Sequence, residues 1–393
     1  MRSTVVYLTA LSALLATPLA GQTDQGAFVV TLGNDTIVVE RYTRTGNQIE
    51  GDMLLRNSGA VVLRHYAGTL NASGGMARFE MTNRPLGNGQ ARGAQFAAAF
   101  GDTTVVDITR DTAKSTVKVA TAGGALPFIN FSYAMYELYG RRATATHADT
   151  IITLPLGATQ PTKLVVGHPG PDALTVSFLN DPPTRFHVDA NGRILSLDGS
   201  ATTQKVVGTR VAALDFAALS TTFQSRPLGT LSPPDSVRAT VGGVNVAINY
   251  GRPAMRSRTV FGGIVPWGAV WRTGANFATR LTTSGDLLVG GRPIPAGTYT
   301  LWSLPTQQGW KLIINKQTKA PCSTAEQCAA PTRAPLWGTD YAADSDLVRI
   351  DMQVSSIAAR VEQFVITVEP QGDGALLALA WEQTRATVAL AKK

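Results

Sequence analysis

Arginine and tryptophan dominate the stretch between Asp235 and Asp286, which contains no Asp, Glu or Lys between these two ends. Guanidinium groups bind carboxylates and phosphates through paired hydrogen bonds, and indole rings offer flat apolar faces on which a sugar can stack. The stretch therefore predicts a site for a small anionic or sugar-like ligand. The predicted ligand-binding residues, including one lysine from a later strand end, are Arg252, Arg256, Arg258, Trp267, Trp271, Arg272, Asn276 and Lys316.

The same residues also fit an architectural role. Buried arginines can bond loop carbonyls or pair with acidic residues further along the chain, and tryptophans can fill a core. The acidic candidates for such pairing are Asp340, Asp344, Asp346 and Glu362. The sequence leaves both interpretations open, and they differ in whether the arginine side chains converge on a hollow that solvent can reach.

No catalytic residues are predicted, because the usual catalytic motifs are absent from the sequence. The chain has 4 histidines, and the last of them, His187, precedes the arginine-rich stretch. Histidine is the commonest general base, so a hydrolase at this stretch would use Asp, Glu, Lys or Tyr instead. That enzyme is an alternative to a binding module. The histidines also lack metal-site spacing, and we expect no metal ion and no cofactor.

The elements that position these residues are predicted to be strands, because Gly, Pro, Thr and Val are abundant in the sequence and favour strands and turns. A proline-rich segment at 225–235 interrupts both strand and helix patterns. It divides the chain into a first domain at 23–228 and a second domain at 232–393. Both domains are predicted to be mainly β.

The first domain reads as a series of short strands with one exception. Gly33 and Asn34 between two β-rich runs predict a hairpin. The segment 128–142 instead places its apolar residues at helical spacing. We expect a curved antiparallel sheet with one helix, which resembles the lipoprotein-carrier half-barrels of bacterial envelopes. The resemblance implies a further alternative function, the carriage of an apolar ligand or a lipoprotein in a groove under that helix.

The second domain shows strand-like runs at roughly ten-residue spacing with Gly and Pro turns, which predict an antiparallel β-sandwich. Several of its motifs resemble the bacterial domain of unknown function 2911 (DUF2911) over residues 232–391. The resemblance rests on the sequences at 250–253, 270–276, 295–299 and 337–338. It implies the extent of the domain but no activity. The chain departs from the family at Phe277, where Glu is frequent, and in a cysteine-containing insertion between Lys316 and Trp337.

The N terminus has the three parts of a secretory signal: Arg2, an apolar run at 5–16 and small residues ending at Gly21. We therefore expect a signal peptide at 1–21 and a periplasmic or secreted protein. In an oxidising compartment Cys322 and Cys328 can form a disulfide. No other segment is long and apolar enough to cross a membrane.

The formal net charge of +8 is spread over 393 residues without a run of Lys or Arg. Nucleic acid is therefore not a predicted partner. The sequence predicts an exported, two-domain, mainly β protein of a bacterial envelope that acts as a non-catalytic binding module. It leaves the oligomeric state open.

Overall fold

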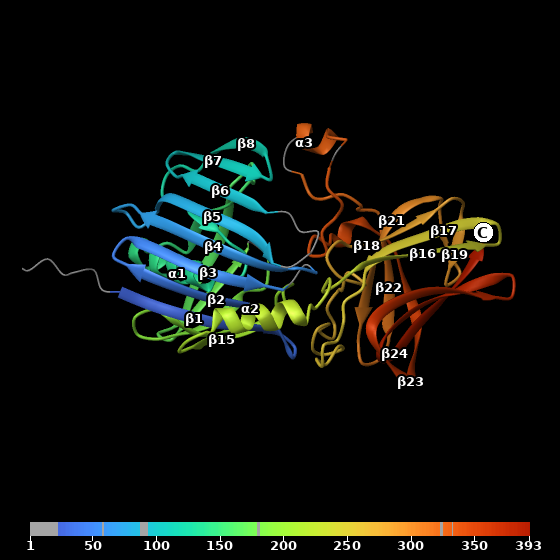
Figure 1. Ribbon diagram of the computed structural model, residues 1–393. Coiled ribbons are helices and arrows are strands. Elements are labelled where there is room, and N and C mark those ends of the chain that lie inside the picture. Colours follow the sequence, from blue (N-terminus) through green and yellow to red (C-terminus); the bar gives the residue numbers. More distant parts are fainter. Residues whose placement is uncertain (1–22, 57–58, 87–92, 179–180, 323–324, 332) are drawn as a thin grey trace, which may run out of the picture.

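The computed structural model describes residues 23–393 apart from 57–58, 87–92, 179–180, 323–324 and 332. The predicted signal peptide at 1–21 lies outside the described residues. The chain is mainly β, and its strands form two separate sheets, as the sequence predicted (Figure 1). None of the helices in the described ranges has the length and hydropathy to cross a membrane.

The first sheet has 15 strands in the order β8-β7-β6-β5-β4-β3-β2-β1-β15-β14-β13-β12-β11-β10-β9. Neighbouring strands run antiparallel, except that β9 and β10 are parallel. The bounds are β1 Thr23–Leu32, β2 Asp35–Thr45, β3 Gln48–Leu55, β4 Val61–Leu70, β5 Met76–Leu86, β6 Ala94–Ala99, β7 Thr103–Arg110, β8 Ala113–Ala120, β9 Leu126–Phe128, β10 Thr150–Pro155, β11 Thr162–Gly170, β12 Ala173–Phe178, β13 Thr184–Val188, β14 Ile194–Asp198 and β15 Val207–Val211.

The first sheet curls around the helix α1 (Tyr133–Thr146). The turn at Gly157, after β10, approaches the side chains of Phe96 and Ile108 on β6 and β7, so the two ends of the sheet come together. A single apolar core lies between the sheet and α1. This arrangement confirms the predicted curved sheet around a helix.

The helix α1 begins later than the sequence predicted. The segment 126–128 forms β9 instead, and the helix begins after Ser132, whose backbone is extended and whose side chain makes no capping bond. The helix ends at His147, which has a left-handed backbone with φ of 49°. Apolar spacing located the helix, but its start depends on a cap supplied by another strand.

A second helix, α2 (Phe216–Ser225), corrects the expectation of one helix in the first domain. Asp215 caps it by accepting a hydrogen bond from the amide of Ala218 at 3.0 Å. Phe216 and Phe223 pack against the outer face of the sheet, where the guanidinium groups of two arginines lie over their rings. Figure 1 shows α2 outside the sheet, on the face opposite to α1.

The second sheet has nine strands in the order β16-β17-β18-β21-β22-β23-β24-β19-β20. Its two longest strands, β23 and β24, bend, and β16 packs near both of them. The sheet therefore folds into two layers, as expected for a sandwich. The bounds are β16 Pro234–Val241, β17 Val244–Gly251, β18 Thr279–Thr283, β19 Leu287–Val289, β20 Arg292–Ile294, β21 Gly297–Pro305, β22 Trp310–Asn315, β23 Asp346–Gln371 and β24 Gly374–Lys392, with a short helix α3 at Ala325–Ala329.

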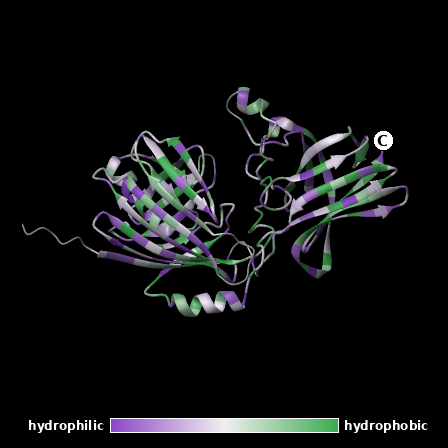
Figure 2. Ribbon diagram, turned by 45° about the horizontal axis from the view of Figure 1, so that its top comes forward, coloured by the Kyte–Doolittle hydropathy of each residue, from purple (hydrophilic) through white to green (hydrophobic). Residues whose placement is uncertain are grey.

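The chain passes from the first sheet to the second between the end of α2 at Ser225 and the start of β16 at Pro234. Pro234 opens an edge strand, a position where its missing amide hydrogen is tolerated. Figure 2 shows hydrophobic and hydrophilic residues alternating along strands of both sheets. Each sheet therefore buries one face in its own core.

Candidate functional site

Arg252 and Arg256 pair with acidic residues. Arg252 Nη1 lies 3.3 Å from Asp235 Oδ2, and its Nε donates to the carbonyl of Phe364 at 3.2 Å. Arg256 reaches into the first domain, where its Nη1 lies 2.5 Å from Asp35 Oδ2. Both guanidinium groups are therefore compensated by contacts within the protein.

Arg258 folds back onto its own loop. Its Nε donates to the carbonyl of Met255 and its Nη2 to that of Ala254, both at 2.9 Å. Its Nη1 has no hydrogen-bond partner among the described residues. Burial and the neighbouring charge of Arg256 lower the pKa of Arg258 to about 10. One edge of this guanidinium group is therefore fixed, whereas Nη1 has no partner in the part of the chain that the structure describes.

Arg272 passes beneath the backbone of Gly338. A Cβ atom on Gly338 would stand 2.1 Å from Arg272 Cδ, so only a glycine fits here. Arg272 Nη1 makes one long hydrogen bond, 3.4 Å, to the carbonyl of Asn276. Burial lowers the pKa of Arg272, against the attraction of Asp181. Its Nε and Nη2 find no partner within the described ranges.

The two predicted tryptophans differ in their surroundings. Trp271 belongs to the core of the sandwich, where its ring stacks on Trp381 at 5.8 Å and meets Phe364 edge-on at 5.0 Å. Trp267 is 40% exposed and lies against Phe261. Trp271 therefore stabilises the fold, and only Trp267 presents a ring to solvent.

Asn276 and Lys316 are both exposed. Asn276 Nδ2 lies 3.4 Å from the carbonyl of Ser232, and its backbone is left-handed with φ of 64°. Lys316 follows the buried Asn315, and its amide donates to the carbonyl of Ser345 at 2.8 Å. The structure thus distributes the predicted set over the domain contact at Arg256, the sandwich core and the surface around Arg258 and Arg272.

Two residues of the first domain come close to Arg258 and Arg272. The pKa of Lys205, just before β15, is lowered to about 8 by burial and then by the positive charges of Arg272 and Arg258. The pKa of Asp181 is raised by burial and by Asp340, while Arg272 acts in the opposite direction. These effects indicate that Lys205 lies near Arg258 and Arg272, and that Asp181 lies near Arg272 and Asp340. We call these five residues the junction charges.

The three cations of this cluster retain free hydrogen-bond donors. Lys205 Nζ, one nitrogen of Arg258 and two of Arg272 have no partner among the residues that the structure describes. None of the three has a described carboxylate oxygen within ion-pair distance. Partly buried like charges repel one another, and the carboxylates that attract Arg272 and Arg258 stay beyond ion-pair distance. An anion placed among the cations relieves that repulsion.

Sequence analysis missed Lys205 and Asp181. Both residues lie in the first domain, far along the chain from the arginine-rich stretch, and no local motif surrounds either of them. Lys205 has a left-handed backbone, with φ of 57°, that single-sequence patterns do not reveal. Only the contact between the two domains brings these residues to Arg258 and Arg272.

A small cavity in the first domain shares Asp181 with the junction charges. Leu164, Val176 and the α1 residue Tyr136 supply apolar walls, and Gln204, next to Lys205, supplies a polar one. Its volume is about 40 Å³, which is room for a few water molecules. This cavity is too small for the acyl chain of a lipid.

A buried carboxylate of β2 caps α1 from inside the sheet. Glu40 Oε2 accepts hydrogen bonds from the amides of Tyr133 and Ala134 at 2.6 and 3.2 Å. Its Oε1 accepts from the hydroxyls of Tyr66 and Ser132 at 2.7 and 2.5 Å. Burial raises the pKa of Glu40 to about 7, although these four hydrogen bonds favour the charged form.

A second buried carboxylate fixes the middle of α1. Glu137 accepts hydrogen bonds from the hydroxyl of Tyr42 at 2.5 Å, from the amide of Ile194 at 2.7 Å and from the guanidinium group of Arg210. Burial raises the pKa of Glu137, and Arg210 opposes this effect. If α1 left the sheet, Glu40 and Glu137 would lose all these partners, which would cost several hydrogen bonds to charged groups.

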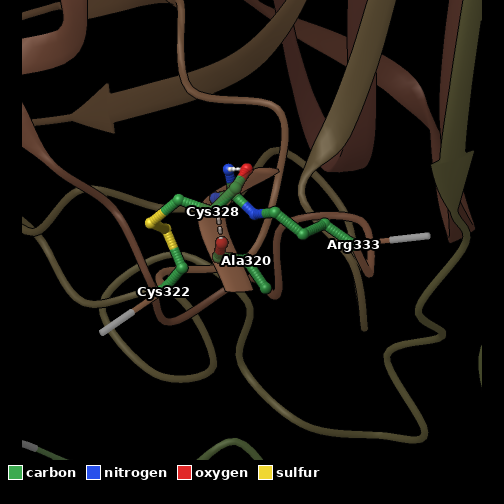
Figure 3. Close-up of a disulfide and its surroundings, with 4 residues drawn as sticks. All are labelled: Ala320, Cys322, Cys328 and Arg333. Atoms are coloured by element: carbon green, nitrogen blue, oxygen red, sulfur yellow. Dashed lines mark hydrogen bonds between the residues drawn. A yellow bond between two sulfur atoms is a disulfide. The ribbon is translucent and has the colours of Figure 1, made fainter. Parts of the chain in front are cut away.

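Cys322 and Cys328 form a disulfide, as the sequence predicted (Figure 3). The bond lies in the insertion between β22 and β23, which also carries α3. Arg333 ties the insertion together by donating to the carbonyl of Ala320 and, at 3.4 Å, to that of Cys328. In Figure 1 the insertion stands away from the strands of both sheets. The disulfide therefore stabilises this insertion locally.

Comparison with known proteins finds no match among curated proteins or solved structures. One family model matches residues 232–390, a range that begins just before β16 and ends within β24. The matched range includes Arg258 and Arg272 and excludes Lys205 and Asp181. The second domain therefore matches DUF2911, a family of proteins of unknown function, as its sequence motifs predicted.

Proposed function

We propose that the protein is a non-catalytic binding module that holds a small anionic ligand at the junction charges. The observation that carries this proposal is that Arg258 and Arg272 are partly buried and keep nitrogens without a described hydrogen-bond partner. Their positive charges also act on Lys205 of the first domain, and none of the three cations has an ion-pair partner among the described residues. A carboxylate or phosphate there accepts charge-assisted hydrogen bonds, which are stronger than bonds between neutral groups.

Both domains contribute to this site. Lys205 comes from the first domain, and the two arginines come from the DUF2911 domain. A ligand that bridges them adds binding energy to the domain contact already made by Asp35 and Arg256. Binding therefore stabilises one arrangement of the two domains.

The carrier alternative has weaker support. It requires α1 to leave the curved sheet, and the hydrogen bonds of Glu40 and Glu137 oppose that movement. A hydrolase would use the remaining carboxyl groups of the cluster, Asp181 and Asp340, because the sequence has no histidine after His187. No contact of these two carboxylates favours that role over the simpler one of hydrogen-bonding a ligand.

An extracytoplasmic location is part of the proposal. The disulfide between Cys322 and Cys328 supports it, because such bonds persist in oxidising compartments. The apolar run and small residues at 1–21 support it from the sequence. We accordingly propose that the mature protein works in the periplasm or outside the cell.

Calorimetric titration of the protein with citrate and with inorganic phosphate tests the binding function. We expect saturable binding that Arg272→Gln weakens at least tenfold, because this substitution removes the positive charge and leaves a shorter, neutral polar side chain. Arg280→Gln is the matched control, since Arg280 is an exposed arginine of β18 outside the cluster. Absence of binding by both anions, or equal binding by wild type and Arg272→Gln, would refute the proposal.

A further inference from the structure

Phe277 and Trp337 form an exposed aromatic pair beside the junction charges. Phe277 is 48% exposed and Trp337 is 38% exposed, although most large aromatic residues of the chain are buried. Their rings meet edge to face, with 5.0 Å between centroids and 83° between planes. Exposed aromatic rings that are held in a fixed geometry are a common feature of binding surfaces.

The backbone holds this aromatic pair rigidly. Phe277 and Trp337 face each other in an isolated antiparallel bridge. The amide of Ala278 donates to the carbonyl of Leu336 at 3.0 Å. The amide of Gly338 donates to the carbonyl of Asn276, also at 3.0 Å. Little conformational entropy is therefore lost when a ligand stacks on these rings.

The same short ladder contacts Arg272. Gly338 lies directly over the aliphatic part of Arg272, and the carbonyl of Asn276 accepts the hydrogen bond from Arg272 Nη1. The residues that flank the aromatic pair on both strands thus touch this arginine. A ligand atom bound to Arg272 lies close to the pair.

The turn after Trp337 faces the first domain. The amide of Asp340 donates to the carbonyl of Trp337 at 3.1 Å, so the two residues share one turn. The charge of Asp340 raises the pKa of Asp181 in the first domain. The aromatic pair therefore shares a turn with Asp340, and Asp181 lies near enough to Asp340 to be affected by its charge.

We propose that the ligand of the junction charges is an acidic saccharide, whose carboxylate or phosphate binds Arg272 and Lys205 while a sugar ring stacks on Phe277 and Trp337. This inference rests on the proposed function. A sugar matches the surface because its C–H face packs on aromatic rings and its hydroxyl groups donate to carboxylates such as Asp340. An acyl chain would offer those carboxylates no hydrogen-bond donor.

Calorimetric titration with three probes tests this inference: trigalacturonate as an acidic saccharide, maltotriose as a neutral one and laurate as an apolar anion. Trigalacturonate should bind at least tenfold more tightly than phosphate, and maltotriose and laurate should bind weakly. Trp337→Ala should lower the affinity for trigalacturonate at least tenfold more than that for phosphate. Phe277→Ala should act in the same direction, and far-UV circular dichroism checks that both variants fold.

Val354→Ala is the control, because Val354 is a large apolar residue of the same domain, 43% exposed, on β23 and outside the predicted binding residues. It should leave the affinity for trigalacturonate within twofold of wild type. If phosphate binds but trigalacturonate binds no better, or if laurate binds best, the saccharide inference is wrong and the anion site remains. If none of the anions binds, the proposed function itself fails.

Discussion

Asp35, the first residue of β2, accepts a hydrogen bond from Arg256 of the DUF2911 domain, with 2.5 Å between Oδ2 and Nη1. The hairpin turn just before Asp35 lies against the same loop, because a Cβ atom on Gly33 would stand 2.0 Å from the carbonyl oxygen of Arg256. The two domains therefore meet through a close backbone approach as well as through an ion pair.

Gly33→Ala should weaken the contact between the domains. The new methyl group would overlap the carbonyl of Arg256, so one domain must shift. Gly46→Ala is the control, since Gly46 also has a left-handed backbone, φ of 58° against 61° for Gly33, but has no atom within 4 Å of the added Cβ. Both variants carry the same backbone strain of about 1 kcal/mol.

The measurement for this pair is small-angle X-ray scattering together with proteolysis of the segment 226–233. Gly33→Ala should increase the radius of gyration and the cleavage rate, and Gly46→Ala should change neither. If the two variants had the same radius of gyration and the same cleavage rate, the close approach of the hairpin turn would not be needed for the contact between the domains.

Glu40 should make the protein less stable as pH rises from about 4.5 to about 7. Its carboxyl group titrates at 4.5 when unfolded and at about 7 when folded, so the folded state binds the extra proton within this window. The contribution of this protonation to the free energy of unfolding is fully present below pH 4.5 and is lost as pH rises through 7. The shift corresponds to a loss on the order of 3 kcal/mol.

Glu40→Gln should remove this pH dependence. The amide keeps an oxygen for the backbone of Tyr133 and Ala134, and its NH2 group can donate to the hydroxyls of Tyr66 and Ser132. The free energy of unfolding of both proteins is measured in urea from pH 4 to pH 8. The value for wild type should fall relative to that of Glu40→Gln as pH rises. Parallel curves for the two proteins would mean that Glu40 does not carry the titration.

Lys205 should make anion binding depend on pH. Its pKa is lowered to about 8, so the ammonium group is charged below this pH and loses its proton above it. The affinity for citrate, which is fully ionised in this range, should fall as pH rises from 7 to 9.5. Lys205→Arg should retain more of the affinity at pH 9.5 than wild type does, because a guanidinium group at this position stays charged. If the affinity of Lys205→Arg for citrate fell with pH as steeply as that of wild type, Lys205 would not be the source of the pH dependence.

Gly338→Ala should weaken citrate binding and destabilise the fold. The added Cβ would stand 2.1 Å from Arg272 Cδ and 2.7 Å from the carbonyl oxygen of Asn276, so Arg272 must leave its place. Overpacking of this kind costs roughly 1–3 kcal/mol. Gly309→Ala, at a glycine with no atom within 4 Å of the added Cβ, should stay within about 0.5 kcal/mol of wild type. Calorimetry and urea unfolding measure both effects, and unchanged binding in Gly338→Ala would contradict the placement of Arg272.

Reduction of the disulfide should loosen the insertion without unfolding the sandwich. The bond joins residues separated by 6 positions, a short loop for which chain entropy predicts a contribution of about 2 kcal/mol. Hydrogen exchange in the peptides covering 317–336 should accelerate on reduction, while that of β21 and β22 should not. Cys322→Ser with Cys328→Ser should reproduce the reduced state. Global loss of protection in the reduced protein would show a larger structural role.

Patterns that depend on neighbouring residues predicted the fold well. The hairpin at Gly33 and Asn34 and the burial of α1 follow from local spacing, and the structure confirms them. The DUF2911 domain follows from its motifs, and the family match confirms it. The strand β6 was missed because its sequence, Ala94–Ala99, contains no β-branched residue. Partners on both sides, β5 and β7, impose its strand conformation.

Helix boundaries and long strands needed information from distant parts of the chain. The start of α1 is set by Glu40, which lies on β2 and leaves no signal near residue 132. The second domain was predicted to have short strands at roughly ten-residue spacing, but residues 346–371 form the single long strand β23, which bends. Its partner β24 follows the bend with shifts of register, so the ladder continues.

Composition and spacing alone determined that the chain is mainly β, that it divides near residue 230 and that arginine and tryptophan concentrate after Asp235, because these features depend on side-chain type and short-range periodicity. Only the tertiary structure decided which of those side chains are paired within the described part of the protein. Arg252 and Arg256 found acidic partners and Trp271 entered the core, whereas Arg258 and Arg272 met Lys205 from the other domain. Charge compensation is a property of distances between atoms, and the folded chain sets those distances.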